Sequence, residues 1–255
     1  MSTALVTGAS AGLGTDFARI LASQKYDLIL VARNEGRLAA LAAELSKEHG
    51  VKVCVLARDL SSPGSADALM LDLKSKRLSV DVLVNNAGVG LHGPVADSDG
   101  AALAGMLQLN VTTLTQLTRL LLPDMLARKG GRILNVASTA AFQPGPWMAG
   151  YYATKAYVLS FSEALASELK GTGVTVTTLC PGPTATEFFE RANMSRSRFK
   201  DIFFADSRPC AQVGVNGMFR GKTIVIHGAL NQLLVLTSKF LPRAVVRFIA
   251  GKLNR

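Results

Sequence analysis

The 255-residue chain lacks the usual features of secreted and membrane-spanning proteins. It has only three cysteines, Cys54, Cys180 and Cys210, an odd number without a C-x-x-C pair, which argues against a disulfide framework or a metal clip. No apolar run approaches the roughly 18 residues that a transmembrane helix needs. The N-terminus leads directly into the apolar residues 4–6, without the basic region and cleavage site of a secretory signal. These absences predict a cytoplasmic protein in a reducing compartment.

Acidic residues are scarce in the last quarter of the chain. Residues 1–190 contain 16 basic and 16 acidic residues, whereas residues 191–255 contain 12 and 2, so the net charge of +10 lies in this tail. A basic tail is either a solvated face or a site for an anionic partner. It contains no recognisable nucleic-acid reading module, so we expect no nucleic-acid partner.

The apolar content of 49% can fill a large core, and the chain length suits one doubly wound α/β domain. Short β-branched or apolar runs alternate with helical patterns, and connections of this length need crossovers. The alternation predicts a Rossmann-type fold with a seven-stranded parallel sheet, right-handed connections and helices on both faces. The predicted strands are 4–7, 28–32, 52–56, 82–85, 132–137, 174–180 and 223–226; the predicted helices are 13–23, 35–48, 66–76, 101–128 and 152–170.

A glycine-rich loop follows the first predicted strand and leads into a helical pattern. Its spacing is G-x-x-x-G-x-G rather than the commoner G-x-G-x-x-G. Glycines permit a tight turn and a close backbone approach to a pyrophosphate, which the N-terminus of the helix favours. An ordinary strand-to-helix turn remains the alternative. The expected dinucleotide contacts here are Gly8, Ser10, Gly12, Leu13 and Gly14.

The end of the second predicted strand indicates which dinucleotide is bound. A fold that binds NAD usually places an acidic residue about 20 residues after the glycine loop, where it accepts from the ribose hydroxyls. This chain has Arg33 there, which can bind a 2′-phosphate and stack on adenine, and Ser10 can donate to the same phosphate. The sequence therefore predicts NADP, with a solvated arginine as the alternative for Arg33.

Tyr151 and Lys155 lie four residues apart at the start of a predicted helix, so they share one face. A nearby ammonium favours the phenolate, so we expect Lys155 to lower the pKa of Tyr151. Ser138 ends the preceding strand, where ligands bind, and its hydroxyl can donate to a substrate oxygen. Tyr152 has no such lysine partner and is assigned to packing or to the pocket wall. The three residues together predict acid–base chemistry at a carbonyl or hydroxyl group.

These motifs resemble the short-chain dehydrogenase/reductase family, in its short three-glycine subtype, over about residues 3–185. Several motifs occur in the family's order and spacing, which makes a chance agreement very improbable. They are Gly8, Gly12 and Gly14; Asp59-Leu60; Asn85-Asn86-Ala87-Gly88; Asn110; Ser138; Tyr151 with Lys155; and Pro181-Gly182 with Thr184 and Thr186.

The resemblance implies a role for each catalytic residue. Tyr151 would be the general acid in carbonyl reduction and the general base in alcohol oxidation. Lys155 would hold the nicotinamide ribose hydroxyls and lower the Tyr151 pKa, while Ser138 would polarise the substrate oxygen. Asn110 would support Lys155 through a water in a proton relay. The cofactor would supply the hydride.

The resemblance also implies further cofactor contacts. Asn86 would stabilise the strand arrangement, and Asp59 would contact the adenine edge, with capping of its own turn as an alternative. Asp16 departs from the family's pattern. Because an acid at this position would repel a close phosphate, we expect its side chain to point outward. The remaining implied contacts are Leu60, Ala87 and Gly88 along the cleft, Pro181 and Gly182 against the nicotinamide, and Thr184 or Thr186 at its carboxamide or a phosphate.

We expect residues 1–185 to form the dinucleotide-binding and catalytic core. Residues 186–255 would add the substrate loop, the last strand and a basic C-terminal segment to the same domain. The apolar residues of these loops predict a pocket for a small apolar carbonyl or alcohol substrate, lipid-like or acyl, although a subunit interface or core role is an equal alternative. They are Phe142, Pro144, Trp147, Met148, Phe188, Phe189, Met194, Phe203 and Phe204.

The C-terminal segment reads as a helix over 230–241, stopped by Pro242, and a second over 243–249. Its apolar and basic residues suit peripheral membrane contact or the closing of a homodimer or homotetramer. His49, His92 and His227 lack metal-ligand spacing and are interpreted as structural, so no metal site is predicted. A nonenzymatic NADP-binding regulator on the same fold remains the alternative function, although such a protein would be expected to lose the tyrosine or the lysine.

Overall fold

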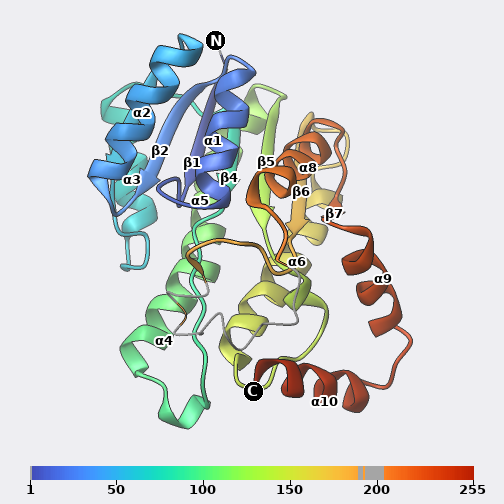
Figure 1. Cartoon of the computed structure of the whole chain (residues 1–255). Coiled ribbons are helices and arrows are strands. Elements are labelled where there is room, and N and C mark those ends of the chain that lie inside the picture. The colour runs from blue at the N-terminus through green and yellow to red at the C-terminus, as the bar shows by residue number, and fades with distance from the viewer. Residues whose placement is uncertain (1, 189–191, 193–203) are drawn as a thin grey trace.

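The computed structural model describes residues 2–188, 192 and 204–255. Its sheet has seven parallel strands in the order β3-β2-β1-β4-β5-β6-β7, which confirms the predicted fold class (Figure 1). The predicted strand boundaries are correct to within about one residue at most ends. The strands are β1 (Thr3–Thr7), β2 (Asp27–Ala32), β3 (Val53–Ala57), β4 (Val82–Asn85), β5 (Gly131–Val136), β6 (Val174–Cys180) and β7 (Ile224–Ile226).

The strand order reverses between β1 and β4. From β1 the chain adds β2 and β3 on one side, and from β4 it adds β5 to β7 on the other. The loops that follow β1 and β4 therefore diverge and leave a crevice between them, where ligands bind in sheets of this kind.

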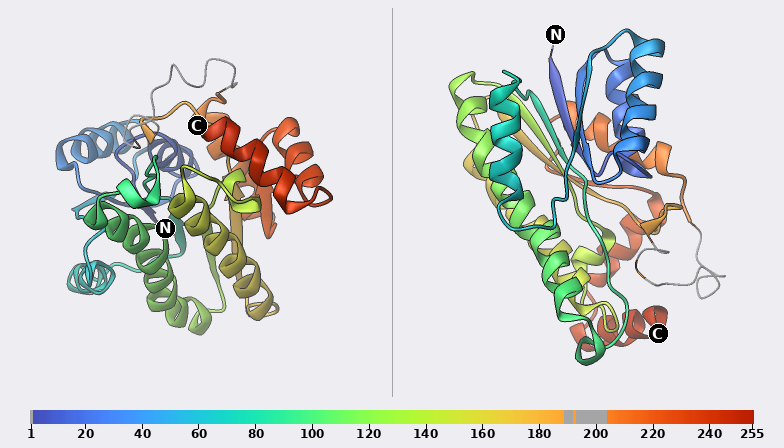
Figure 2. Two further views of the ribbon diagram at one scale, coloured as in Figure 1. Left: turned by 90° about the horizontal axis from the view of Figure 1, so that it is seen from below. Right: turned by 90° about the vertical axis from the view of Figure 1, so that its left-hand side faces the viewer.

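Helices cover both faces of the sheet (Figure 2). Alternate residues of β1 show the two sides, because Ala4 and Val6 pack under α1, α2 and α8, whereas Leu5 packs under α3, α5 and α6. The helices are α1 (Leu13–Ser23), α2 (Glu35–His49), α3 (Ser65–Ser75), α4 (Gly100–Leu107), α5 (Leu114–Ala127), α6 (Ala149–Glu168), α8 (Ser207–Phe219), α9 (Ala229–Ser238) and α10 (Arg243–Asn254), with short 3₁₀ turns at Val95–Asp97 and Thr139–Phe142.

The predicted long helix over 101–128 is interrupted. A π-helical segment, η2 (Gln108–Thr113), separates α4 from α5. The hydroxyl of Thr113 donates to the Leu60 carbonyl at 2.8 Å, and the side chain of Asn110 bonds to the backbone of Val89. Because π segments change which side chains face inward, this interruption directs Asn110 toward the crevice region.

The C-terminal segment extends from β7 as two helices joined at Pro242, which ends the first helical pattern as predicted. Figure 1 shows α9 and α10 at the side and base of the molecule, away from the strands. Within the described residues, no helix combines the length and the apolar character that crossing a bilayer requires.

Candidate active site

A cleft of about 1580 Å³ lies at the carboxyl ends of the strands. Its walls come from the loops after β1, β2, β3, β4, β5 and β6, from the start of α6, and from α9 and α10. All predicted cofactor and catalytic residues line this cleft except Gly14 and Asn110, which lie behind its wall. The tertiary structure thus gathers side chains from across the chain into one site.

The three glycine positions of the loop are packed too closely to accommodate a side chain. Gly8 has φ +66°, and a Cβ there would lie 2.9 Å from the Ala87 Cα. Gly12 has φ +55°, and its Cβ would lie 2.8 Å from the Thr186 Cγ2, while a Cβ on Gly14 would collide with the Gly8 carbonyl oxygen. This loop leaves its backbone open to the cleft at the N-terminus of α1, which fits the pyrophosphate of a dinucleotide.

Asn86 joins the two central strands at the edge of the cleft. Its side-chain nitrogen donates to the carbonyl oxygens of Thr7 and Gly8 at 2.9 and 3.3 Å. The Thr7 hydroxyl accepts from the backbone amides of Asn86 and Ala87, both at 3.0 Å. These bonds hold the loops after β1 and β4 together around Gly8.

Asp59 forms the cap of its own turn. Its carboxylate accepts from the Ser61 amide at 2.9 Å and from the Ser61 hydroxyl at 2.7 Å. Burial raises the pKa of this carboxyl, but the Ser61 hydrogen bonds and the charge of Arg33 outweigh it and hold the pKa below its ordinary value. Asp59 therefore has the capping role that the sequence analysis gave as its alternative. Arg33 lies on the same side of the cleft.

Three arginines lie near this end of the cleft. Arg37 is engaged by Glu187, and Arg58 by Asp72. Arg33 lines the cleft and is exposed, and no carboxylate among residues 2–188, 192 and 204–255 forms an ion pair with it. Its guanidinium is thus available to an anionic group in the cleft.

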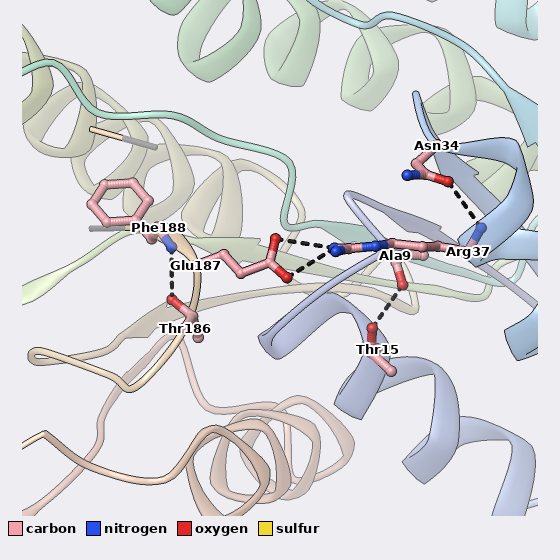
Figure 3. A network of polar contacts seen from close by, with 7 residues as sticks. All are labelled: Ala9, Thr15, Asn34, Arg37, Thr186, Glu187 and Phe188. Carbon is pink, nitrogen blue, oxygen red and sulfur yellow. Dashed lines mark hydrogen bonds and ion pairs between the residues drawn. The ribbon is translucent and has the colours of Figure 1, made fainter. Parts of the chain in front are cut away.

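The loop after β6 contacts both sides of the cleft, and Figure 3 shows its ion pair with Arg37. Glu187 pairs with Arg37 on α2, and the Thr186 hydroxyl accepts from the Phe188 amide at 3.3 Å. The Phe188 ring lies 5.1 Å, centroid to centroid, from the Tyr151 ring. The sequence analysis did not foresee the Arg37–Glu187 pair, because the two residues are far apart in the chain.

The three predicted catalytic side chains converge. Ser138 follows β5, and its hydroxyl accepts from the Ala140 amide at 3.1 Å and donates to the Pro181 carbonyl at 3.4 Å. On α6, the Lys155 Nζ lies 5.8 Å from the centroid of the Tyr151 ring and donates to the Val136 carbonyl at 2.8 Å. All three line the cleft.

The predicted direction of the Tyr151 pKa shift is wrong in this structure. Burial raises this pKa well above its ordinary value, and the nearby Ser138 hydroxyl, which lowers it, does not compensate. Burial lowers the pKa of Lys155 to about 8. The Lys155 ammonium donates to the Val136 carbonyl, so desolvation of the phenol sets the direction of the Tyr151 pKa shift.

Asn110 lies behind Gly88. Its side chain accepts from the Val89 amide at 3.0 Å and donates to the Val89 carbonyl at 2.8 Å and to the Thr154 hydroxyl at 3.1 Å. A Cβ on Gly88 would lie 3.2 Å from the Asn110 Oδ1 and 3.4 Å from the Lys155 Nζ. The Asn110 amide oxygen and the Lys155 ammonium therefore both lie beside the backbone at Gly88.

The predicted substrate residues are divided among several places. Phe142, Met148 and Phe188 line the cleft, and Phe204 packs beside Met148. Pro144 is not in its wall, and the prediction for Trp147 is wrong, because its ring lies in a separate hollow against α10 and under the Arg255 guanidinium, 5.5 Å away. The predicted residues Phe189, Met194 and Phe203 lie outside the described residues.

The C-terminal helices form a wall that the sequence analysis did not assign to the site. The apolar character of α9 on more than one side was the signal for it. His227 also lines the cleft, and its Nδ1 is buried without a partner among the residues that the structure describes. The wall residues are Leu230, Leu234, Val235 and Leu241 from the α9 segment and Val246, Ile249, Leu253 and Asn254 from α10.

The end of α10 is anchored at the start of α6. The Tyr152 hydroxyl donates to the Asn254 Oδ1 at 3.2 Å, and the Asn254 side-chain nitrogen donates to the Pro146 carbonyl at 3.1 Å. His92 Nε2 lies 2.7 Å from the Asn254 carbonyl oxygen. Tyr152 therefore fastens the wall next to Tyr151.

The expectation that Asp16 points outward is wrong. Its side chain is buried between α1 and α8, and its carboxylate accepts from the Ser207 hydroxyl at 2.5 Å. The start of α8 covers this part of α1, so the acid is satisfied by the Ser207 hydroxyl and does not line the cleft.

Comparison with known proteins agrees with this geometry. The family model described as short chain dehydrogenase matches residues 2–197. A very-long-chain 3-oxoacyl-CoA reductase of Phaeosphaeria nodorum is 38% identical over 68% of this chain and 52% of its own length, so the chain spans about half of that relative. Sulfoacetaldehyde reductase 2 of Chromohalobacter salexigens is 34% identical over 92% of this chain and 94% of its own.

Solved structures of short-chain dehydrogenases also resemble this chain. A short-chain dehydrogenase from Sphingobium yanoikuyae in complex with NADPH superposes with a TM-score of 0.84 at 32% identity, covering 94% of each chain. The family model covers well over half of the chain, and the fold, the glycine loop and the serine–tyrosine–lysine site occur together. The chain therefore belongs to the short-chain dehydrogenase/reductase family.

Proposed function

We propose that this protein is an NADP-dependent oxidoreductase that reduces a carbonyl group, or oxidises the corresponding alcohol, on an apolar substrate. The observation that carries the proposal is the convergence of Ser138, Tyr151 and Lys155 in one cleft with the glycine loop. The nicotinamide cofactor supplies or accepts the hydride when bound, and the protein supplies position, a proton and electrostatics.

Tyr151 transfers the proton. Because its pKa is raised by burial, the phenol is protonated near neutral pH and is ready to donate to a carbonyl oxygen as negative charge develops there. Ser138 stabilises that oxygen with its hydroxyl, which lines the same cleft as Tyr151.

Lys155 and Asn110 position the cofactor side of the reaction. With a pKa of about 8, Lys155 is mostly an ammonium at neutral pH and donates to ribose hydroxyls. Asn110, next to Gly88, supports Lys155 through a water. Pro181 and Gly182 line the cleft and would contact the nicotinamide, and Thr184 or Thr186 would bind its carboxamide or a phosphate.

Arg33 selects NADP. Arg37 and Arg58 are neutralised by carboxylates, whereas Arg33 has no ion-pair partner in the part of the chain that the structure describes. A 2′-phosphate supplies such a partner, and Ser10 adds a hydroxyl. The complex of the Sphingobium yanoikuyae relative with NADPH supports this choice.

The substrate has an apolar body. Leu230, Leu234, Leu241, Ile249 and Leu253 line the cleft beyond the catalytic side chains, so its outer part suits an acyl or lipid-like chain. The names of relatives as very-long-chain 3-oxoacyl-CoA reductase and ketoacyl reductase support this class.

The test is a screen of NADPH oxidation against aldehydes, ketones and 3-oxoacyl esters of increasing chain length. We expect turnover that rises with chain length and is lost in Tyr151→Phe. Tight NADPH binding without turnover of any carbonyl or alcohol would instead support the regulator, and equal use of short polar aldehydes would contradict the apolar substrate class.

A further inference from the structure

The outer side of α9 carries an exposed apolar stripe. Leu233, Leu236 and Phe240 follow one another at spacings of three and four residues, so they lie on one side of the helix and its final turn. Their side chains are 56%, 53% and 81% exposed. None of the three lines the cleft. We call these three residues the outer stripe.

The opposite side of the same helix faces the cleft. Leu230, Leu234 and Val235 are part of the cleft wall. The apolar character of the outer stripe is therefore not explained by the proposed substrate site. Beyond Pro242, α10 adds two further exposed apolar residues that lie outside the cleft wall, Val245 and Phe248.

The segment that carries this surface has charge of one sign. Residues 207–255 contain eight basic residues and no acidic residue. Five of the basic side chains are exposed along the two helices. They are Lys239, Arg243, Arg247, Lys252 and Arg255.

This positive charge distinguishes between two candidate partners of the outer stripe, a second copy of the chain and a phospholipid surface. A second copy of the chain docked through the same surface would bring two groups of cations together, which is unfavourable. An anionic phospholipid surface offers negative headgroups for the cations and an acyl region for the leucines and the phenylalanine. With ten residues in α9 and twelve in α10, each helix is too short to cross a hydrocarbon core of about 30 Å, so contact is confined to the surface.

We propose that α9 and α10 dock this protein on anionic bilayers, with the outer stripe inserted among the headgroups and the basic side chains facing the lipid phosphates. Docking places the other side of α9, which is the cleft wall, close to the bilayer. The binding itself does not depend on the proposed oxidoreductase activity, so its test needs no substrate.

The experiment is cosedimentation of the full chain with phosphatidylcholine vesicles, with and without phosphatidylserine, at low and high salt. We expect binding that requires phosphatidylserine and falls with salt. The combined variant Leu233→Gln, Leu236→Gln and Phe240→Gln should bind about tenfold more weakly, because it removes the inserted apolar groups. Circular dichroism and thermal unfolding establish that each variant is folded.

A matched control is available on α3, away from the two C-terminal helices. Leu71 on α3 is 68% exposed, and Leu71→Gln makes the same chemical change as Leu233→Gln away from the two helices. We expect Leu233→Gln to weaken vesicle binding and Leu71→Gln to leave it unchanged. Lys239→Gln with Arg243→Gln should weaken binding chiefly at low salt.

Several results would overturn the proposal. They are absence of sedimentation with phosphatidylserine vesicles, equal sedimentation with both vesicle types, and unchanged binding by the folded combined variant. A lower mass of the combined variant in analytical ultracentrifugation without lipid would assign the stripe to a second copy of the chain instead.

Discussion

The Arg37 Nη1 donates to both carboxylate oxygens of Glu187, at 2.8 and 3.0 Å, and so joins the first turn of α2 to the loop after β6 (Figure 3). The next residue, Phe188, packs against the ring of Tyr151. The ion pair therefore connects the side of the cleft that carries Arg33 with the side that carries Tyr151.

Glu187→Gln should loosen this loop without unfolding the protein. The pair is partly exposed, and such pairs contribute only about 0.2–1 kcal/mol to stability. We expect a several-fold rise in the KM of the substrate with little change in the melting temperature, measured by steady-state kinetics and thermal unfolding.

Glu44→Gln is the matched control for this change. Glu44 and Arg19 form a similar two-bond ion pair, at 2.8 and 3.0 Å, between α1 and α2 and outside the cleft wall. It should leave KM unchanged. An equal KM in the Glu187→Gln protein and the unmodified protein would show that the pair does not position the loop.

Arg33→Asp should reverse or abolish the preference for NADP. The substitution places a carboxylate where the 2′-phosphate needs a cation. We expect the unmodified protein to bind NADPH at least about tenfold more tightly than NADH, which corresponds to about 1.4 kcal/mol, in a fluorescence titration. Arg119→Asp on α5 makes the same charge change outside the cleft wall and should have no such effect. Equal affinities in the unmodified protein would refute this assignment.

Tyr151→Phe should reduce kcat by about 100-fold or more while NADPH binding persists, because only the transferable proton is removed. Tyr152→Phe should mainly affect KM, since its hydroxyl holds Asn254 of the cleft wall at 3.2 Å. Full turnover by Tyr151→Phe, or an equal loss of kcat in both variants, would contradict the assignment of the proton donor.

Lys155 makes the stability depend on pH. Burial lowers its pKa from 10.5 to about 8, so between these values the unfolded chain holds a proton that the folded protein has released. The free energy of unfolding should therefore rise with pH from about 8 to about 10.5, by at most ~3 kcal/mol. Lys155→Met should remove this rise in urea titrations. Conversely, NADPH affinity should fall above about pH 8, as the ammonium loses its proton.

Local patterns in the sequence determined the fold. Alternating apolar runs and helical periodicity placed all seven strands, and Pro242 marked the break between α9 and α10, because these signals depend on neighbouring residues. The spacing of Tyr151 and Lys155 and the glycine loop likewise predicted which residues line the cleft. Such motifs are readable because each lies within a few residues of the chain.

Only the tertiary structure decided the features that join distant segments. The Arg37–Glu187 pair, the burial of Asp16 against Ser207, and the fastening of Asn254 to Tyr152 each depend on how separate elements pack. The direction of the Tyr151 pKa shift was mispredicted for the same reason. Helical spacing brings Lys155 near, but the phenol's desolvation depends on every element around it, and this desolvation sets the direction of the shift.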